Sequence, residues 1–114
     1  MTEPDSFGQE LLTRFPACHV TPGGEVWVPH ADAVAAVDLA QELGLQLLGM
    51  EGFLVGETGV YPSMSRITDY STPRFVGNPY DDAKALLTGD WAEIPDDLHG
   101  DAEGKYLIDL VVAS

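Results

Sequence analysis

Residues 45–61, LQLLGMEGFLVGETGVY, decide the fold of this chain. Residues 45–55 are mostly apolar and contain two glycines and a glutamate, a pattern typical of a long β-strand with a bulge or bend. The tetrapeptide GETG that follows favours a turn, so Val60 and Tyr61 begin a returning strand. This pattern predicts a hairpin, whose two strands must be antiparallel.

A helix is expected immediately before this hairpin, over residues 31–43. Asp32 lies in its first turn, where the helix dipole favours an anion, and Gly44 follows its last turn, as is typical of helix C-termini. Apolar residues recur at helical spacing and predict a buried stripe of Val34, Val37, Ala40 and Leu43.

The N-terminal part of the chain carries the signals of a short helix and a short hairpin. Ser6 and Gln9 form a capping-box pattern at the start of a helix over residues 7–15. Residues 17–20 and 25–28 are predicted to be two strands, because the TPGG that joins them is a tight-turn sequence.

The chain after the long hairpin is predicted to be irregular over residues 62–70, with Ile67 and Met64 as candidate buried anchors. Asn78 is followed by a proline, which predicts a helix over residues 79–88. The reason is that asparagine caps helix N-termini and proline suits the first helical position.

The C-terminal part combines a polar connection over residues 90–104 with a strand over residues 106–112, whose side chains alternate between two faces. The order of elements predicts one α+β domain, with a mainly antiparallel sheet and about three helices packed on it. A phosphate-binding α/β fold is disfavoured, because Gly23 and Gly24 lead into a strand and not into a helix. The expected core comprises Leu11, Phe15, Val34, Val37, Leu47, Phe53, Leu86 and Leu110.

Charge is the strongest compositional signal in these 114 residues. Nineteen acidic residues face five basic ones, for a formal net charge of −14. Such a surface repels nucleic acids and anionic lipids and attracts basic proteins. Two interpretations stay open, one in which the charge speeds capture of a basic partner and one in which it only keeps the protein soluble.

Location is predicted from what the sequence lacks. Residues 1–5 are acidic where a secretion signal would be basic, and no run reaches the ~20 apolar residues of a membrane helix. The single cysteine, Cys18, fits a reducing compartment. We therefore expect a cytoplasmic protein.

Candidate catalytic and metal-binding residues are few. His19, His30 and His99 have no metal-ligand spacing, and we expect His30 to be a helix cap or a surface residue. Cys18 and His19 are neighbours on a strand and point to opposite faces, so they do not form a nucleophile–base pair. We expect no catalytic residue, no metal and no cofactor, and Cys18 as a small buried hydrophobic residue.

Acidic residues are dense between positions 90 and 103, where no lysine or arginine occurs. Trp91 lies among them and is either an interface anchor or a core residue that holds the segment in place. Glu51, in a mostly apolar strand, is exposed, pairs with an arginine or has a function, and Asp69 is a second isolated acid. We expect the partner surface to include Asp90, Trp91, Glu93, Asp96, Asp97, Glu51 and Asp69.

Residues 34–71 contain an alanine-rich helix, LLGMEGF at 47–53, a short hairpin, Pro62 and ITDYS at 67–71. This run resembles small bacterial immunity proteins that accompany polymorphic toxins, and it covers about a third of the chain. The resemblance implies a protein that binds a cognate, basic toxin and blocks its active site, and it implies no catalytic residues. Two alternatives stay open: a small enzyme that uses Glu51 or Asp69 as acid or base, and an accessory or structural domain.

Overall fold

The computed structural model describes residues 3–56, 59–94 and 105–113, which form three helices and a five-stranded sheet. The strand order is β1-β2-β5-β3-β4, and every strand pairing is antiparallel. In chain order the elements are α1 (Ser6–Arg14), β1 (His19–Val20), β2 (Val26–Pro29), α2 (His30–Glu42), β3 (Gln46–Gly56), β4 (Gly59–Asp69), α3 (Pro79–Thr88) and β5 (Lys105–Ala113).

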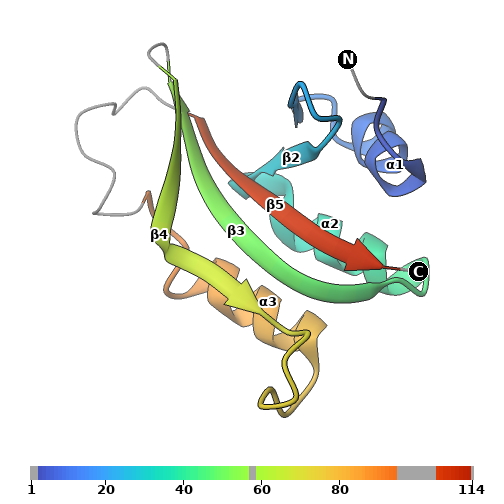
Figure 1. The fold of residues 1–114 in the computed structure, drawn as a ribbon, viewed down its shortest axis with the longest axis vertical. Helices are drawn as coiled ribbons and strands as arrows, with labels where there is room; N and C mark the ends of the chain where they lie inside the picture. The colour runs from blue at the N-terminus through green and yellow to red at the C-terminus, as the bar shows by residue number, and fades with distance from the viewer. Residues whose placement is uncertain (1–2, 57–58, 95–104, 114) are drawn as a thin grey trace.

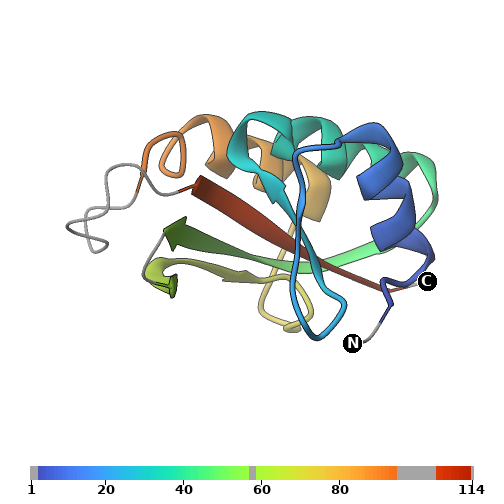
Figure 2. The same ribbon diagram turned by 90° about the horizontal axis from the view of Figure 1, so that it is seen from above.

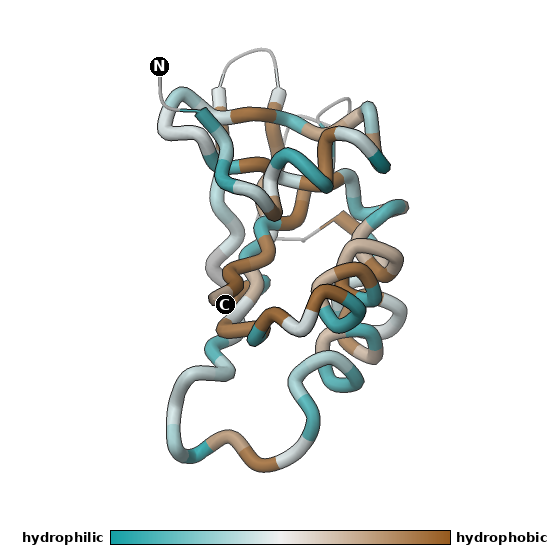
Figure 3. Tube along the Cα trace, turned by 90° about the vertical axis from the view of Figure 1, so that its right-hand side faces the viewer, coloured by the Kyte–Doolittle hydropathy of each residue, from teal (hydrophilic) through white to brown (hydrophobic). Residues whose placement is uncertain are grey.

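The three helices lie in one layer on one face of the curled sheet (Figures 1 and 2). Figure 3 shows long hydrophobic stretches along the strands, whereas hydrophobic and hydrophilic residues alternate along the helices. Each helix therefore turns one side to the sheet and the other to solvent. The predicted α+β fold, with a mainly antiparallel sheet and three helices packed on it, is confirmed.

The helix ends follow capping rules, with one correction to the sequence prediction. Asn78 caps α3 as predicted, since its side chain accepts hydrogen bonds from the backbone N–H groups of Tyr80 and Asp81. The N-cap of α1 is Asp5 and not Ser6: the Asp5 carboxylate accepts from the Gly8 N–H at 2.8 Å, and Ser6 is already helical.

The core between the helices and the sheet confirms most of the predicted set. Among those residues, Leu11, Val37, Leu47 and Leu110 are buried there, whereas Phe15, Val34 and Leu86 are partly buried at its margin. The stripe of α2 is rotated from the prediction: Ala33, Ala36 and Ala40 are buried, and Leu43 is about half exposed. Small side chains therefore face the sheet, which brings the helix backbone close to it.

Strand β3 follows the prediction, and its two internal glycines mark register shifts. β3 shifts register against β4 between Glu51 and Phe53, and against β5 between Leu47 and Gly49. A Cβ atom on Gly49 would lie 2.5 Å from the Thr68 carbonyl oxygen, so a larger residue would force the backbone of β4 away. Glycine is required there for the strands to pair at this distance.

The expectation for residues 62–70 was wrong. β4 continues as a strand to Asp69, and Ile67 is 51% exposed and not a buried anchor. The side chain of Met64 lies outside the described residues. A polar strand with a proline is tolerated here because β4 is at the edge of the sheet, where one side has no neighbouring strand and the missing N–H of Pro62 disturbs the sheet least.

Candidate functional site on the uncovered face of the sheet

The face of the sheet opposite the helices is built from alternate residues of β3 and β5. Their register pairs Glu51 with Asp109 and Phe53 with Leu107, and residues paired in this way point to the same face. Leu107 and Phe53 belong to a small apolar cluster that is separate from the helix-side core. We call this surface the uncovered face.

An aromatic cluster anchors the uncovered face next to β2. The rings of Trp27 and Phe53 are stacked, 4.0 Å between centroids and 6° between planes, and Leu107 beneath them is 1% exposed. The Trp27 indole N–H donates to the Glu25 carboxylate at 3.1 Å. This hydrogen bond holds Glu25 at the margin of the apolar cluster.

Asp109 lies between two other carboxylates on this face. Burial, together with the negative charges of Glu25 and Glu51, raises the pKa of Asp109 to about 7. Two ion pairs occur in the described part of the chain, Arg14 with Glu10 and Lys84 with Asp38. Neither includes one of these three acids, so none of the three has a salt-bridge partner there. The site therefore has a negative potential that a positively charged ligand would neutralise.

Exposed apolar side chains surround these carboxylates. Val111, two residues after Asp109 on β5, is 40% exposed, and Ile67, which pairs with Glu51 on β4, is 51% exposed. Protein interfaces combine apolar contacts with a charged rim in this way. The uncovered face is thus suited to contact another protein.

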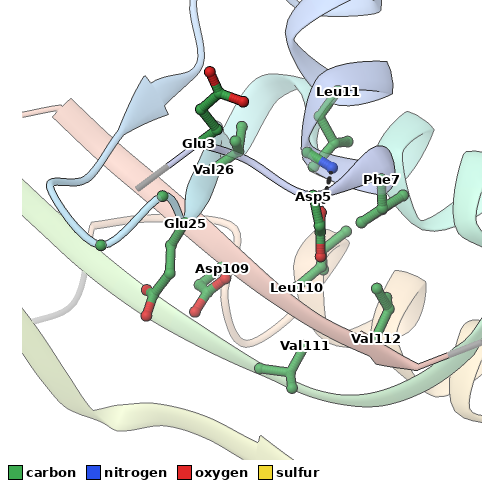
Figure 4. Close-up of a pocket in the computed structure, with 13 residues that line it drawn as sticks. Glu3, Asp5, Phe7, Leu11, Glu25, Val26, Asp109, Leu110, Val111 and Val112 are labelled. Carbon is green, nitrogen blue, oxygen red and sulfur yellow. Dashed lines mark hydrogen bonds between the residues drawn. The ribbon is translucent and has the colours of Figure 1, made fainter. Parts of the chain in front are cut away.

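A cleft of about 410 Å³ adjoins this face between α1, the β1–β2 turn and β5 (Figure 4). Its described lining contains four carboxylates and no lysine, arginine, histidine, serine or cysteine. In Figure 4 the carboxylates of Glu25, just before β2, and Asp109, on β5, lie side by side. The acids that line the cleft are Glu3, Asp5, Glu25 and Asp109.

The residues predicted for the partner surface do not gather in one place. Glu51 lies on the uncovered face, and Asp69, which pairs with Gly49, lies on the same face at the end of β4. Asp69 accepts hydrogen bonds from the side chain and backbone N–H of Ser71, which lower its pKa. These hydrogen bonds favour the charged form of Asp69 at the turn after β4.

The predicted acidic segment after α3 is described only in part. Asp90 and Glu93 are exposed there, whereas Asp96 and Asp97 lie outside the described residues. Trp91 is 4% exposed and packs in the core, and its carbonyl accepts a hydrogen bond from the Tyr106 hydroxyl at 2.9 Å. Of the two interpretations of Trp91, the structure supports the core residue and not the interface anchor.

The sequence prediction missed Glu25, Trp27 and Asp109 as members of a common site. Asp109 had one visible signal, since it is the only charged residue within the apolar run 107–112. Its neighbours could not be identified, because the pairing of Asp109 with Glu51 depends on the register shift in β3.

His30 and Cys18 have structural surroundings. The His30 Nε2 atom lies 2.8 Å from the Leu87 carbonyl oxygen, and the His30 ring stacks on Tyr106. His30 therefore joins α2 to α3. It is not an exposed residue, and the N-cap of α2 is Pro29 and not His30. Burial, with a smaller effect of Asp32, raises the pKa of Cys18 to about 11, so its thiolate is scarce at neutral pH. Neither residue lines the acidic cleft.

No protein-family model, no curated protein and no solved structure matches this chain. Within the described residues, no helix is long and apolar enough to cross a membrane, and no group of three potential metal ligands occurs. Function is therefore inferred from the residues and geometry of the uncovered face and its cleft.

Proposed function

We propose that this chain is a cytoplasmic inhibitor of the bacterial immunity type, which binds a basic toxin domain and occludes its active site. The observation that carries the proposal is the uncovered face, where Glu25, Glu51 and Asp109 have no cation and lie beside exposed Val111. A basic surface would neutralise these carboxylates and cover the apolar residues between them. Occlusion needs shape and charge complementarity and no chemistry of its own.

The net charge of −14 supports this function in a second way. Long-range attraction between an acidic inhibitor and a basic toxin raises the rate of encounter by one or more orders of magnitude at low salt. Fast capture protects a cell that makes its own toxin, because the toxin is neutralised before it reaches a substrate. The immunity-type resemblance of residues 34–71 points to the same class.

A carboxylate enzyme is the second candidate, and the raised pKa of Asp109 beside a cleft favours it. The described lining of that cleft supplies no serine, cysteine, histidine or lysine to work with a carboxylate, and no cationic side chain to stabilise a developing anion. Four carboxylates around one cleft would also repel anionic substrates. The site therefore supports the binding function better than it supports catalysis.

The test of the proposal is protection of a growing cell. The chain is co-expressed with each secreted toxin domain found near its gene in the native host, and survival and direct binding are measured for the parent and for the variant Glu25→Gln/Glu51→Gln/Asp109→Asn. We expect the parent to protect the cell and the variant to bind at least ~100-fold more weakly, because charged pairs at an interface each contribute ~1.5 kcal/mol or more.

The matched control is Asp38→Asn/Asp90→Asn/Glu93→Gln, which removes the same number of charges away from the uncovered face. This control variant should protect as well as the parent. Equal loss in both variants would show that total charge and not the uncovered face determines binding. Toxicity that the parent does not relieve, together with turnover of a test substrate that Asp109→Asn abolishes, would favour the enzyme.

A further inference from the structure

The cleft is the place where two strands of the sheet separate. β2 pairs with β5 only at Val28 with Ile108 and Pro29 with Leu107. β5 continues to Ala113, and over residues 109–113 its described pairing is with β3 alone. One edge of β5 therefore presents the backbone N–H and C=O groups of alternate residues within 109–113 towards the cleft.

The walls of the cleft differ on its two sides. Leu110 and Val112 face the helix layer, near the side chain of Phe7 from α1, and are part of the core or packed against it. Asp109 and Val111 face the uncovered side, where Glu25 approaches from the β1–β2 turn (Figure 4). The cleft thus has an apolar wall under α1 and an acidic wall at the uncovered face.

We propose that this cleft binds an extended, basic polypeptide segment, which adds a strand to the free edge of β5 at residues 109–113. The identity of the protein that supplies this segment rests on the proposed function, whereas the binding mode does not depend on it. Strand addition uses backbone hydrogen bonds for affinity and alternate side chains for specificity. The acidic wall fixes the charge of the segment, because the described lining of the cleft has four carboxylates and no lysine or arginine to neutralise them.

The geometry also fixes the sequence pattern of the ligand. A strand rises ~3.3 Å per residue, so the edge of Asp109 to Val112 accommodates a segment of about four residues, ~13 Å long. Side chains of an added strand alternate between the two faces. Residues opposite Asp109 should be lysine or arginine, and residues next to Leu110 should be apolar.

The first experiment measures binding of three synthetic peptides to the intact protein. The probes are acetyl-KVKVKVK-amide, the same peptide with alternate backbone nitrogens methylated, and acetyl-EVEVEVE-amide. We expect the first to bind, the methylated peptide to lose at least ~10-fold in affinity because it cannot pair as a strand, and the acidic peptide not to bind. NMR amide exchange should show new protection at alternate residues within 109–113, those whose N–H points away from β3, with the first peptide only.

The second experiment places a positive charge at the rim of the cleft. Gly23 has room for a side chain, since the nearest atom to an added Cβ is 3.8 Å away and its φ is not in the left-handed region. Gly23→Lys should weaken binding of the basic peptide at least ~10-fold, whereas Ala85→Lys, on the exposed side of α3, should leave it unchanged. Equal thermal unfolding of both variants excludes a folding defect.

Three results would overturn the inference. The methylated peptide could bind as well as the parent peptide, which would mean attraction by charge alone. The amides that respond could lie outside residues 109–113. The protein could dimerise through this edge in sedimentation experiments, so that a second copy occupies the cleft. Peptide binding without protection from the toxin would reject the proposed function and keep the binding mode. Protection from the toxin without peptide binding would keep the proposed function and reject the binding mode.

Discussion

The two faces of the sheet are built from the same strands but have opposite chemistry. The helix-covered face is apolar, with Met50, Ile108 and Leu110 sealed beneath α1, α2 and α3. The uncovered face places Glu51 and Asp109 between a small aromatic cluster and exposed aliphatic residues. Because strand residues alternate between faces, residues next to each other in β5 belong to a core and to a candidate binding surface.

The two faces of the sheet thus differ in role. The helix-covered face stabilises the fold, and the uncovered face is the one for which we propose partner binding. Helix packing on one face removes enough apolar surface to fold a chain of this length. The other face then carries the half-buried Asp109, whose raised pKa reflects the cost of ionising a carboxyl group there beside Glu25 and Glu51. Groups that weaken the fold without a local partner are typical of functional surfaces.

The largest expected effects come from truncating one residue on each face. Met50→Ala, on the covered face, should lower the free energy of unfolding by ~2–5 kcal/mol, because the side chain is fully buried. Phe53→Ala should cost about 3 kcal/mol, because Phe53 is 9% exposed and stacks on Trp27. Ile67→Ala, an exposed control on the uncovered face, should change stability by less than ~0.5 kcal/mol. Urea denaturation measures all three.

A different outcome for Phe53 would sharpen the comparison between the faces. If Phe53→Ala unfolds like the parent, the aromatic cluster adds nothing to the fold. Trp27 and Phe53 would then be interface anchors, and the uncovered face would have no stabilising core of its own. Loss of partner binding in that stable variant would identify them as such.

The second prediction concerns the pH dependence that Asp109 gives to the uncovered face. Its pKa in the folded protein is about 7, above the ordinary 3.8, so the folded state holds a proton that the unfolded state releases. The associated stability is fully present below pH ~4 and is lost as the pH rises through about 7. Asp109→Asn should therefore stabilise the protein by ~1–3 kcal/mol at pH 8 and have little effect at pH 4.5.

Urea denaturation at pH 4.5, 6 and 8 tests this sign. The carboxylates that face Asp109 are Glu25 from the β1–β2 hairpin and Glu51 from β3, and Glu51→Gln should give a smaller stabilisation in the same direction. Asp69→Asn is the control, because its pKa is lowered by Ser71 and its charge should not destabilise at pH 8. A stabilisation by Asp109→Asn that is equal at all three pH values would contradict the assignment.

The sequence was sufficient for those parts of the fold that depend on local signals. Asn78 before a proline marked the start of α3, and Gly44, at φ +71°, marked the end of α2. The β3–β4 hairpin followed from apolar periodicity and a turn tetrapeptide. These signals are local because capping and positive φ depend on one or two residues.

The candidate site could not be predicted because it depends on which residues meet across strands. β4 was missed beyond Tyr61, since one side of an edge strand faces solvent and its polar composition is that of a loop. Trp91 was correctly considered as a core residue, but its acidic neighbours kept the interface alternative open. Asp109 meets Glu25 and Glu51 only through the strand order and the register of β3 against β5. The glycines of β3 signal a bulge, but they do not indicate which residues it brings together.

The smallest expected effects are on the rate of partner capture, and they separate contact from long-range attraction. Glu51→Gln/Asp69→Asn removes two charges from the uncovered face, and Asp96→Asn/Asp97→Asn removes two from the acidic segment near α3. Both should slow association with a basic partner by about two- to fivefold at low salt, because both reduce the steering field. At 1 M salt the Debye length is ~3 Å, and the difference in association rate between variants and parent should vanish.

Only the first pair should also raise the dissociation rate, since only the uncovered face is in contact in the proposed complex. Stopped-flow mixing at two salt concentrations measures both rates. Association that is indifferent to salt and to both variants would mean that the net charge serves solubility alone. A higher dissociation rate for the Asp96/Asp97 pair alone would move the interface from the uncovered face to the acidic segment.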